Sequence, residues 1–366
     1  MKTSPRSCVL IDLAAVRHNV AHLVDMLAPG TRLLVAVKAD GYGHGTLPVA
    51  RAAVAAGAQG VAVATAEEAV ALRDAGYAQT ILVMGPLYSF DQYEEMARQG
   101  VEFAVVSDHM AAVLPGLRGS GLRARVHLKI DSGMNRQGLF PEEVGPFLES
   151  IRGIPEIELA GVMTHFACVP EDPATVDFQL GRFLPAVEEV RREWPGVIAH
   201  AANSAATVQA PRSHLDMVRC GCAVYGLSPW QEDAVAEGLR PALAWKSQVA
   251  LVKRVAAGEG VGYGHAFRPG RPTDVALVPI GYGDGVFRAF SNQGEVLING
   301  RRYPVAGRIS MDSFGVDVGT DGSVRVSDTV TLIGADGEDR ISVEEVARRL
   351  GTINYEITCD IALDRT

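Results

Sequence analysis

The stretch Leu33-Leu34-Val35-Ala36-Val37-Lys38-Ala39-Asp40-Gly41-Tyr42-Gly43-His44-Gly45 joins a run of five apolar residues to a lysine and a glycine-spaced turn. The apolar run predicts a buried strand. The glycines at positions 41, 43 and 45 permit the tight backbone that brings a chain close to a ligand. An amine that follows a buried strand loses hydration, and a lysine activated in this way suits Schiff-base chemistry. For this segment alone, a lysine that merely begins a loop remains the alternative.

The same apolar pattern recurs along the chain, and helical patterns separate its occurrences. The eight strand candidates are 33–37, 61–64, 81–84, 103–106, 126–130, 159–163, 198–201 and 217–225. The helical patterns between them include 67–75, 90–98, 142–151 and 174–194. Eight β–α units in roughly 220 residues fit the size and order of a TIM-type (β/α)8 barrel. A doubly wound open sheet is the alternative, but it gives no reason for eight repeats.

A second domain is expected after the Gly- and Pro-marked stretch 226–241. Its strand candidates are 247–255, 273–280, 295–298, 302–306, 314–318 and 329–333. Asn299-Gly300 lies between two of these runs and is a strong signal for a type I′ hairpin. One helix is expected at 343–350, with Ser342 as its N-cap, Glu345 completing a capping box and Gly351 ending it. We therefore predict a barrel at 1–238 and a mainly β C-terminal domain at 239–366.

The overall composition excludes several classes of protein. The 366 residues are 48% hydrophobic and 21% charged, which is typical of a globular protein. The formal net charge is -9 and no basic tract occurs, so no nucleic-acid partner is expected. No apolar segment suits a signal peptide or a membrane span, and a cytoplasmic location without membrane partners is the expectation. Cys220 and Cys222 lack the second pair that a zinc site needs, so no metal is expected.

Residues with unusual chemistry gather at the carboxyl ends of the predicted strands. They are Lys38 after the first strand, Lys129 and Arg136 at the fifth, His165 at the sixth, Ser204 at the seventh, and Arg219, Gly221 and Cys222 at the eighth. Taken singly, Ser204 is more often a helix cap and Arg219 a solvated or ion-paired group. Barrel enzymes keep their active sites at this end of the barrel. The convergence of these residues therefore predicts an active site there.

These stretches, in this order, resemble the alanine racemases, and the segment around Lys38 resembles the pyridoxal-phosphate attachment site of that family. The resemblance runs from Ile11-Asp12-Leu13 to Asn354-Tyr355-Glu356, which is essentially the whole chain. It implies a pyridoxal 5'-phosphate-dependent isomerase that interconverts L-alanine and D-alanine. Such an enzyme would supply D-alanine for bacterial peptidoglycan and the cell wall.

A pyridoxal-phosphate site requires a lysine, a phosphate cradle and a partner for the ring nitrogen. Lys38 is the candidate lysine. The candidates for the cradle are Ser204, the amides of Gly221 and Cys222 and, by resemblance, the hydroxyls of Tyr42 and Tyr355. By resemblance, Arg219 faces the ring nitrogen. Because arginine has only donors and stays protonated, it cannot hand that nitrogen a full proton, which favours rapid reprotonation of the substrate.

Racemisation needs two bases on opposite faces of one α-carbon. Lys38 can serve one face. Tyr263, in Gly260-Val261-Gly262-Tyr263-Gly264-His265, resembles the family's second base. A tyrosine acts as a base near neutral pH only with cationic or hydrogen-bonding neighbours. By resemblance, His165 supplies this help, bonded to Tyr263 and linked to Arg219.

Tyr263 belongs to the β-rich domain but has to meet Lys38 at the barrel rim. In alanine racemases a head-to-tail homodimer brings the tyrosine to the neighbouring barrel. By resemblance, Met311, Asp312 and Tyr282 are further residues contributed across this interface, with Met311 near the substrate. Ordinary packing is the alternative for Tyr282 and Met311.

Arg136 is the best candidate to bind the substrate carboxylate through charge-assisted hydrogen bonds. In the family, the lysine equivalent to Lys129 often carries a carbamate, which would orient Arg136. An unmodified Lys129 paired with Asp131 or with solvent is the alternative. Asn135 and Cys222 depart from the commonest family pattern, and neither replaces a catalytic group.

Three other functions compete with alanine racemisation. A broad-specificity racemase of the same fold would need a more open pocket than Tyr355 and Tyr263 leave. A decarboxylase of similar architecture pairs the ring nitrogen with a carboxylate, whereas Arg219 stands at this position here. A non-catalytic pyridoxal-phosphate carrier typically ends after the barrel, so the β-rich domain argues against it.

Overall fold

The computed structural model describes residues 6–169 and 171–361. Contacts divide them into two compact units, one of residues 13–224 and one of residues 6–12 together with 225–361. The division differs from the predicted barrel at 1–238 at both ends. Residues 7–11 pair with a strand of the second unit. The segment 225–238 also bonds to that unit, where the Ser228 amide donates to Glu344 Oε1. None of the described helices is both long and apolar enough to cross a membrane.

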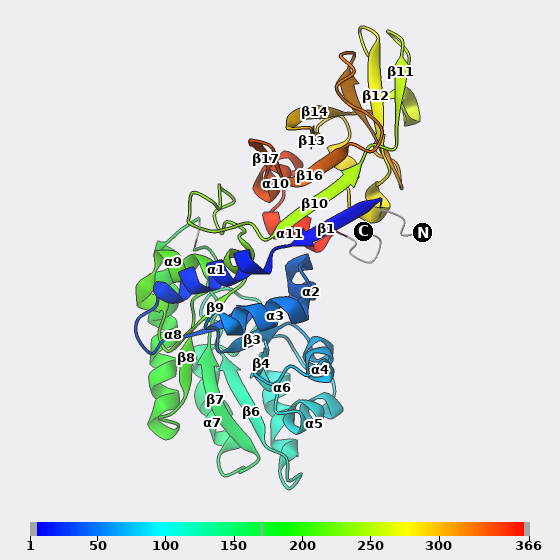
Figure 1. The fold of residues 1–366 in the computed structure, drawn as a ribbon. Coiled ribbons are helices and arrows are strands. Elements are labelled where there is room, and N and C mark those ends of the chain that lie inside the picture. The colour runs from blue at the N-terminus through cyan, green and yellow to red at the C-terminus, as the bar shows by residue number, and fades with distance from the viewer. Residues whose placement is uncertain (1–5, 170, 362–366) are drawn as a thin grey trace. The chain divides into compact units, whose positions relative to one another are not determined.

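The first unit is a closed parallel barrel of eight strands, which confirms the predicted (β/α)8 architecture (Figure 1). The strands are β2 (Arg32–Ala36), β3 (Gly60–Val63), β4 (Thr80–Val83), β5 (Glu102–Val105), β6 (Ala124–Lys129), β7 (Ile157–Met163), β8 (Ile198–His200) and β9 (Met217–Cys220). Each pairs in parallel with the next, and β9 closes on β2 with Val218 opposite Leu33. The last predicted strand, 217–225, was too long, since β9 ends at Cys220 and a 3-10 turn, η4 (Cys222–Tyr225), begins after Gly221.

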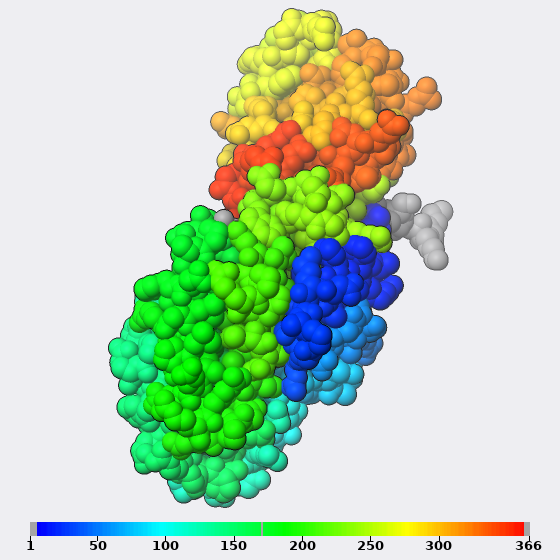
Figure 2. Space-filling model, turned by 90° about the vertical axis from the view of Figure 1, so that its left-hand side faces the viewer, coloured from blue at the N-terminus to red at the C-terminus, as the bar shows by residue number. Residues whose placement is uncertain are grey.

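Helices surround the barrel, so most strand residues are buried on both faces. They are α1 (Leu13–Asp25), α2 (Lys38–Gly43), α3 (Thr46–Ala55), α4 (Ala66–Asp74), α5 (Phe90–Arg98), α6 (Asp108–Val113), η1 (Leu114–Leu117), η2 (Pro141–Glu143), α7 (Val144–Ile151), α8 (Ala174–Glu193), α9 (Ser204–Gln209) and η3 (Pro211–Ser213). In Figure 2, α1 (blue) lies beside the green segment that ends the barrel, and Asn19 Nδ2 donates to Val224 O at 3.1 Å.

The second unit is built on one nine-stranded antiparallel sheet, which confirms a mainly β second domain. Its strand order is β1 (Ser7–Ile11), β10 (Leu243–Gln248), β16 (Thr329–Asp336), β13 (Glu295–Ile298), β14 (Arg301–Ala306), β15 (Phe314–Gly319), β12 (Thr273–Val278) and β11 (Leu251–Val255), with β17 (Asp339–Ile341) on β16. The helical segments are η5 (Tyr263–His265), η6 (Tyr282–Asp284), η7 (Arg288–Phe290), α10 (Val343–Leu350) and α11 (Asn354–Cys359).

The predicted single strand at 247–255 is wrong, because the chain changes partners within it. β10 pairs with β1 and β16, whereas β11 pairs with β12. Between them, the amides of Val249 and Ala250 donate to Asp328 O and Leu277 O, on two different strand partners. The apolar residues 249–252 therefore span a change of strand partners that periodicity does not reveal.

The predicted hairpin and helix end are confirmed. Asn299 and Gly300 both have positive φ, 52° and 74°, as a type I′ turn requires. Ser342 Oγ accepts from the amide of Glu345 at 3.1 Å, and Gly351 ends α10 with a φ of 71°. The expected second half of the capping box is absent from this described helix, because Arg302 and Arg349 engage the Glu345 carboxylate instead.

Candidate active site

Lys38 opens an unusual turn at the carboxyl end of β2. Residues 39–42 all have positive φ, 53° at Ala39, 48° at Asp40, 60° at Gly41 and 55° at Tyr42, which makes one turn of left-handed helix. Left-handed geometry costs an L-residue with a Cβ about 1–2 kcal/mol, and only one of the four is glycine. Lys38 itself is exposed, so the expectation that the strand would bury its amine is wrong. Backbone strain, rather than burial, distinguishes this turn.

Lys129 is the last residue of β6 and is only 5% exposed. Burial is the main cause that lowers the pKa of Lys129 to about 8. The positive charges of three neighbouring residues at the rim lower this pKa further, and these residues are Arg219, Arg136 and Lys38. Its Nζ donates to Gln137 Oε1 at 2.9 Å, so the partner of the unmodified amine is an amide rather than Asp131, which was the alternative considered for it. Four cationic side chains thus share one end of the barrel.

Asp131 shapes the loop that carries Arg136. Its carboxylate accepts from the amides of Gly133, Asn135 and Arg136 at 3.0, 3.0 and 2.9 Å. Burial acts to raise the pKa of Asp131, but these backbone amides outweigh it and the pKa is lowered. Asn135 tolerates its φ of 55° because asparagine adopts left-handed geometry more readily than most residues. The Asp131 carboxylate is thus engaged by backbone amides, and the cations that gather at this rim, Lys38, Lys129, Arg136 and Arg219, suit an anionic ligand.

Arg219 lies in β9 with 4% of its surface exposed. Its Nη1 donates to Nδ1 and O of His200 at 3.0 and 3.1 Å. Its Nη2 donates to Thr164 O at 2.6 Å and lies 3.4 Å from His165 Nδ1. Burial lowers the pKa of Arg219 to about 10, so the guanidinium stays charged near neutral pH. The predicted link between His165 and Arg219 is therefore present in the barrel.

His165 belongs to the same electrostatic cluster. Burial first, and then the charges of Arg219, Lys129, Arg136 and Lys38, hold its pKa well below the ordinary value. A cation beside four others is unfavourable, so the imidazole is neutral near pH 7. A neutral His165 can accept from Arg219 at Nδ1 and donate from Nε2.

Two buried histidines extend the Arg219 contacts through the barrel, and sequence reasoning missed them. His200 Nε2 lies 2.7 Å from His127 Nδ1, and His127 Nε2 lies 2.8 Å from Glu102 Oε2. Because Arg219 donates to His200 Nδ1, one tautomer satisfies the row, with each histidine protonated at Nε2. This row of hydrogen bonds begins at the Arg219 cation and ends at the Glu102 carboxylate. Burial acts to raise the pKa of Glu102, but His127 and Arg125 outweigh it, so the pKa is lowered and the group is a carboxylate.

Sequence signals for this row existed in the strands themselves. His127 lies between Val126 and Leu128, and His200 lies within the apolar run 197–202, so each is a polar side chain in a buried stretch, where it needs a partner. Gly161 on β7 makes room for the first of them, since a Cβ there would lie 2.2 Å from His127 Nδ1. The pairing of partners from different strands could not be read from either strand alone.

The cradle residues of the first unit come together after β8 and β9. Ser204 is 4% exposed, and its Oγ accepts from the amide of Gly221 at 2.9 Å. A Cβ on Gly221 would lie 2.5 Å from Tyr42 Oη, so both hydroxyls converge on this glycine. The Gly221 amide is therefore engaged by Ser204 Oγ, and the Ser204 side chain also bonds the Cys220 thiol. A phosphate fits these donors beside the rim cations.

The remaining predicted residues lie in the second unit. Tyr263 is 71% exposed, Tyr282 44% and Met311 53%, and Asp312 is exposed as well. The amides of Tyr282 and Gly283 donate to Ser310 O and Met311 O at 3.0 and 2.9 Å, which ties the two segments together. Tyr355 lies on α11 and is half-buried.

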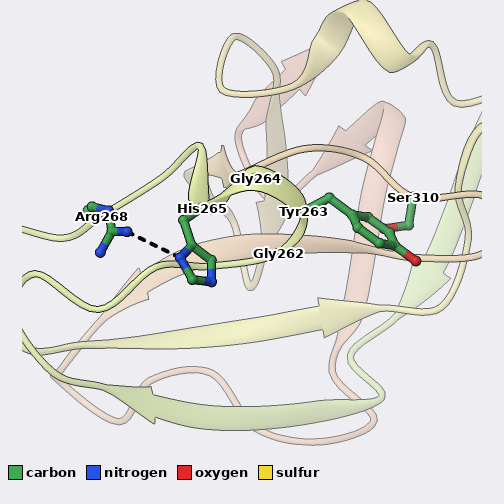
Figure 3. A pocket seen from close by; sticks show the side chains of 6 residues that line it. All are labelled: Gly262, Tyr263, Gly264, His265, Arg268 and Ser310. Atoms are coloured by element: carbon green, nitrogen blue, oxygen red, sulfur yellow. Dashed lines mark hydrogen bonds between the residues drawn. The ribbon is translucent and has the colours of Figure 1, made fainter.

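Tyr263 borders an open pocket of about 700 Å³ in this unit (Figure 3). The pocket is lined by Gly262, Tyr263, Gly264, His265, Arg268 and Ser310. Figure 3 shows Tyr263 and Ser310 on one side of the turn, with His265 and Arg268 on the other. Together with Tyr282 and Met311, Tyr263 belongs to a set of exposed aromatic and apolar side chains in this unit, as is typical of a surface that binds another protein. Within residues 6–169 and 171–361, no cluster of three His, Cys, Asp or Glu side chains is arranged to hold a metal.

The barrel, its cation-rich rim and the β-rich second unit define a two-domain (β/α)8-barrel enzyme. The model of the alanine racemase N-terminal domain matches residues 11–229, and the model of the alanine racemase C-terminal domain matches residues 242–365. The chain belongs to the alanine racemase family and is therefore an amino-acid racemase, an isomerase.

Individual relatives agree over nearly the whole chain. It is 40% identical to the alanine racemase of Syntrophobacter fumaroxidans over 360 residues, which is 98% of this chain and 96% of the relative. Identity to the alanine racemase of Symbiobacterium thermophilum is 43%, over 96% of this chain and 94% of the relative. The solved alanine racemase of Bacillus anthracis with bound L-Ala-P has a TM-score of 0.90 and 36% identity, covering 99% of this chain and 94% of that one. The alanine racemase of Streptomyces lavendulae, a producer of D-cycloserine, also has a TM-score of 0.90, with 37% identity, 99% of this chain and 96% of that one.

Proposed function

We propose that this chain is a pyridoxal 5'-phosphate-dependent alanine racemase that exchanges the α-proton of alanine between two bases. Lys38 serves one face of the α-carbon, and Tyr263 of the partner subunit serves the other. The observation that carries the proposal is the cluster of Lys38, Lys129, Arg136 and Arg219 at one barrel rim, in a chain of this family.

The residues at the rim fit the cofactor. The Lys38 amine would attach it, and the Tyr42 and Ser204 hydroxyls, with the Cys222 amide, would hold its phosphate, joined by Tyr355. Both terminal nitrogens of Arg219 already donate within the barrel, so we assign its Nε–H to the ring nitrogen. When bound, the cofactor withdraws the electron pair left at the α-carbon when the proton departs.

Each base moves one proton. From L-alanine, the phenolate oxygen of Tyr263 takes the α-proton as the Cα–H bond breaks, and the Lys38 ammonium returns a proton to the opposite face. From D-alanine, the two groups exchange roles. We propose that neutral His165 donates from Nε2 to the Tyr263 oxygen, since its pKa is held low by burial and by the rim cations.

Substrate binding is assigned to the loop after β6. The Arg136 guanidinium would bind the carboxylate of alanine, and Tyr355 and Met311 would limit the side-chain pocket to a small group. The structure with bound L-Ala-P from Bacillus anthracis supports an alanine-like ligand. We further propose that Lys129 reacts with carbon dioxide to a carbamate and releases a proton, because its lowered pKa of about 8 makes the free amine accessible. The resulting anion would orient Arg136.

The remaining parts of the proposal concern assembly and biology. A head-to-tail homodimer would bring Tyr263, Tyr282, Met311 and Asp312 of one subunit to the barrel rim of the other. Their exposure on one surface supports it. We also propose that the enzyme acts in the bacterial cytoplasm and supplies D-alanine for peptidoglycan, which the bacterial sources of the relatives support.

Chiral product analysis tests the function. The purified protein with pyridoxal 5'-phosphate would be offered L-alanine, L-serine, L-lysine and L-arginine separately. D-Alanine should form fastest, with no amine and no carbon dioxide released. Faster racemisation of lysine or arginine would favour a broad-specificity racemase of the same fold. Amine formation would mean decarboxylation and would contradict the assignment of Arg219.

A further inference from the structure

The left-handed turn after Lys38 is held by a carboxylate from a neighbouring β–α connection. Glu68 lies in the first turn of α4, which follows β3, the strand next to β2. Its Oε1 accepts from the amide of Ala39, the residue directly after Lys38, at 2.7 Å. Its Oε2 accepts from the amides of Ala64 and Thr65 at 2.7 and 3.3 Å. One carboxylate therefore binds two consecutive rim loops to each other.

The local sequence of the turn does not make its backbone favourable. Ala39, Asp40 and Tyr42 all carry a Cβ and all have positive φ. Such geometry persists only where the surroundings determine it from several directions. Asp40 and Thr46 fix the far end of the turn, where Asp40 Oδ1 accepts from the Thr46 amide at 2.9 Å. At the near end, where Lys38 leaves the strand, the Glu68 bond to Ala39 is a fixed contact from outside the turn.

Glu68 also has an ordinary structural role, and it can be separated from the first. Thr65 is the N-cap of α4, and its side chain accepts from the amide of Glu68 at 3.3 Å to form a capping box. Of the contacts that the Glu68 side chain makes, the capping box needs only the one with the Thr65 amide. The contact with Ala39 lies outside that motif, 29 residues away in sequence.

We propose that Glu68 is a positioning residue for Lys38, which fixes the direction in which the lysine leaves β2. This proposal rests on the proposed role of Lys38. Glu68 contacts neither substrate nor cofactor in it, and it acts through the Ala39 amide. A carboxylate suits the task because it has acceptors on both oxygens and no donor. In a Glu68→Gln variant, the NH2 of the side-chain amide has to face either the Ala39 amide or the Ala64 and Thr65 amides. A donor then meets a donor, and one of the hydrogen bonds is lost whichever way the group is turned.

Hydrogen exchange and kinetics test the proposal together. In the cofactor-free protein, the Ala39 amide should exchange about 10-fold faster or more in Glu68→Gln than in wild type. In the loaded enzyme, kcat should fall about 10-fold to 100-fold, because a small displacement of a reacting group has this effect. The KM for alanine should stay near wild type, since the Arg136 loop is unchanged. A Glu68→Asp variant, which keeps the charge but shortens the side chain, should show the same pattern and serves if Glu68→Gln does not fold.

Two matched variants isolate the effect. Glu67→Gln changes the adjacent carboxylate, which bonds Gln92 and Thr65 but not Ala39, and should leave both readouts unchanged. Thr65→Val removes the cap of α4 but keeps the Ala39 contact, and it should leave kcat within about 3-fold of wild type. Equal losses of kcat in Thr65→Val and Glu68→Gln would overturn the proposal, as would faster exchange at Ala39 with an unchanged kcat. The exchange measurement needs no cofactor, so an error in the role of Lys38 would appear separately as racemisation by Lys38→Ala.

Discussion

Residues of one chemical type behave differently at this rim because their surroundings differ. Lys38 is exposed on a strained turn, whereas Lys129 is buried among cations and its pKa is lowered to about 8. The strained backbone after Lys38 sets the position of that lysine, whereas burial and neighbouring cations favour the neutral, reactive amine of Lys129. Both lysines were predicted as site residues from their position after apolar strands, but this pattern could not distinguish the two causes.

The lowered pKa of Lys129 predicts a pH dependence of stability. Between about pH 8 and 10.5 the unfolded chain holds this proton and the folded chain does not, so stability rises with pH by up to ~1.4 kcal/mol per unit. Lys129→Met should remove this part of the rise, while Lys253→Met, at an exposed lysine, should retain it. Urea unfolding in carbon-dioxide-free buffers from pH 7 to 11 measures the slopes. Equal slopes in wild type and Lys129→Met would contradict the assignment.

The hydroxyl of Tyr263 gives the second prediction at this scale. Tyr263→Phe should lower racemisation in both directions by about 10²-fold to 10⁴-fold, the range for loss of a positioned acid or base. Binding of pyridoxal 5'-phosphate should be unchanged, because the cradle residues of the barrel remain. Tyr88→Phe, at another strongly exposed tyrosine, is the control and should be fully active. Near-normal rates in the Tyr263 variant would remove it from the mechanism.

Elements were easiest to predict where one physical signal determines them. The eight barrel strands are apolar because helices cover their outer faces, and their runs lie within one or two residues of the observed strands except for the last. Asn299-Gly300 was predictable because few residues accept two successive positive φ values. The change of partner at Val249 and Ala250 was not, since partners are chosen by tertiary contacts that a local pattern does not contain.

The candidate site shows the same division. Lys38, Ser204 and Arg219 were predicted as candidate site residues because each lies near or after the carboxyl end of a barrel strand. A barrel brings these strand ends together. The left-handed turn was not predicted, because Ala39, Asp40 and Tyr42 have no local preference for it. His127 and His200 were missed because their meaning depends on a pairing across the barrel interior.

The space beside His127 gives a prediction for β7. Gly161→Ala would place a Cβ 2.2 Å from His127 Nδ1, so the ring has to move and its bonds to His200 and Glu102 weaken. We expect a loss of about 1–3 kcal/mol in the free energy of unfolding. Gly181→Ala in α8, where a Cβ would meet nothing within 4 Å, should be neutral or stabilising by up to ~1 kcal/mol. Chemical unfolding of both variants measures this, and an unperturbed Gly161→Ala would show that the row tolerates displacement.

At the scale of the whole molecule, the groups that we propose to be catalytic are divided between two compact units. The barrel carries Lys38, Arg136 and Arg219, and the β-rich unit carries Tyr263 and Met311 on an exposed surface. The sequence predicted two domains, but it placed β1 with the barrel because strand pairing between distant segments is not local information. In the proposed mechanism this division makes the homodimer a requirement for catalysis, since each active site takes Lys38 from one subunit and Tyr263 from the other.

Subunit complementation tests this central claim most directly. Lys38→Ala and Tyr263→Phe homodimers should each be inactive, because every site lacks one base. After dissociation and random reassociation of equal amounts, racemisation should recover to about a quarter of the wild-type rate, since half of the dimers are mixed and each mixed dimer has one intact site. Mass spectrometry of the mixed dimers verifies the exchange of subunits. Recovery at that level would establish that Lys38 and Tyr263 act together across the interface, and no recovery in verified mixed dimers would contradict it.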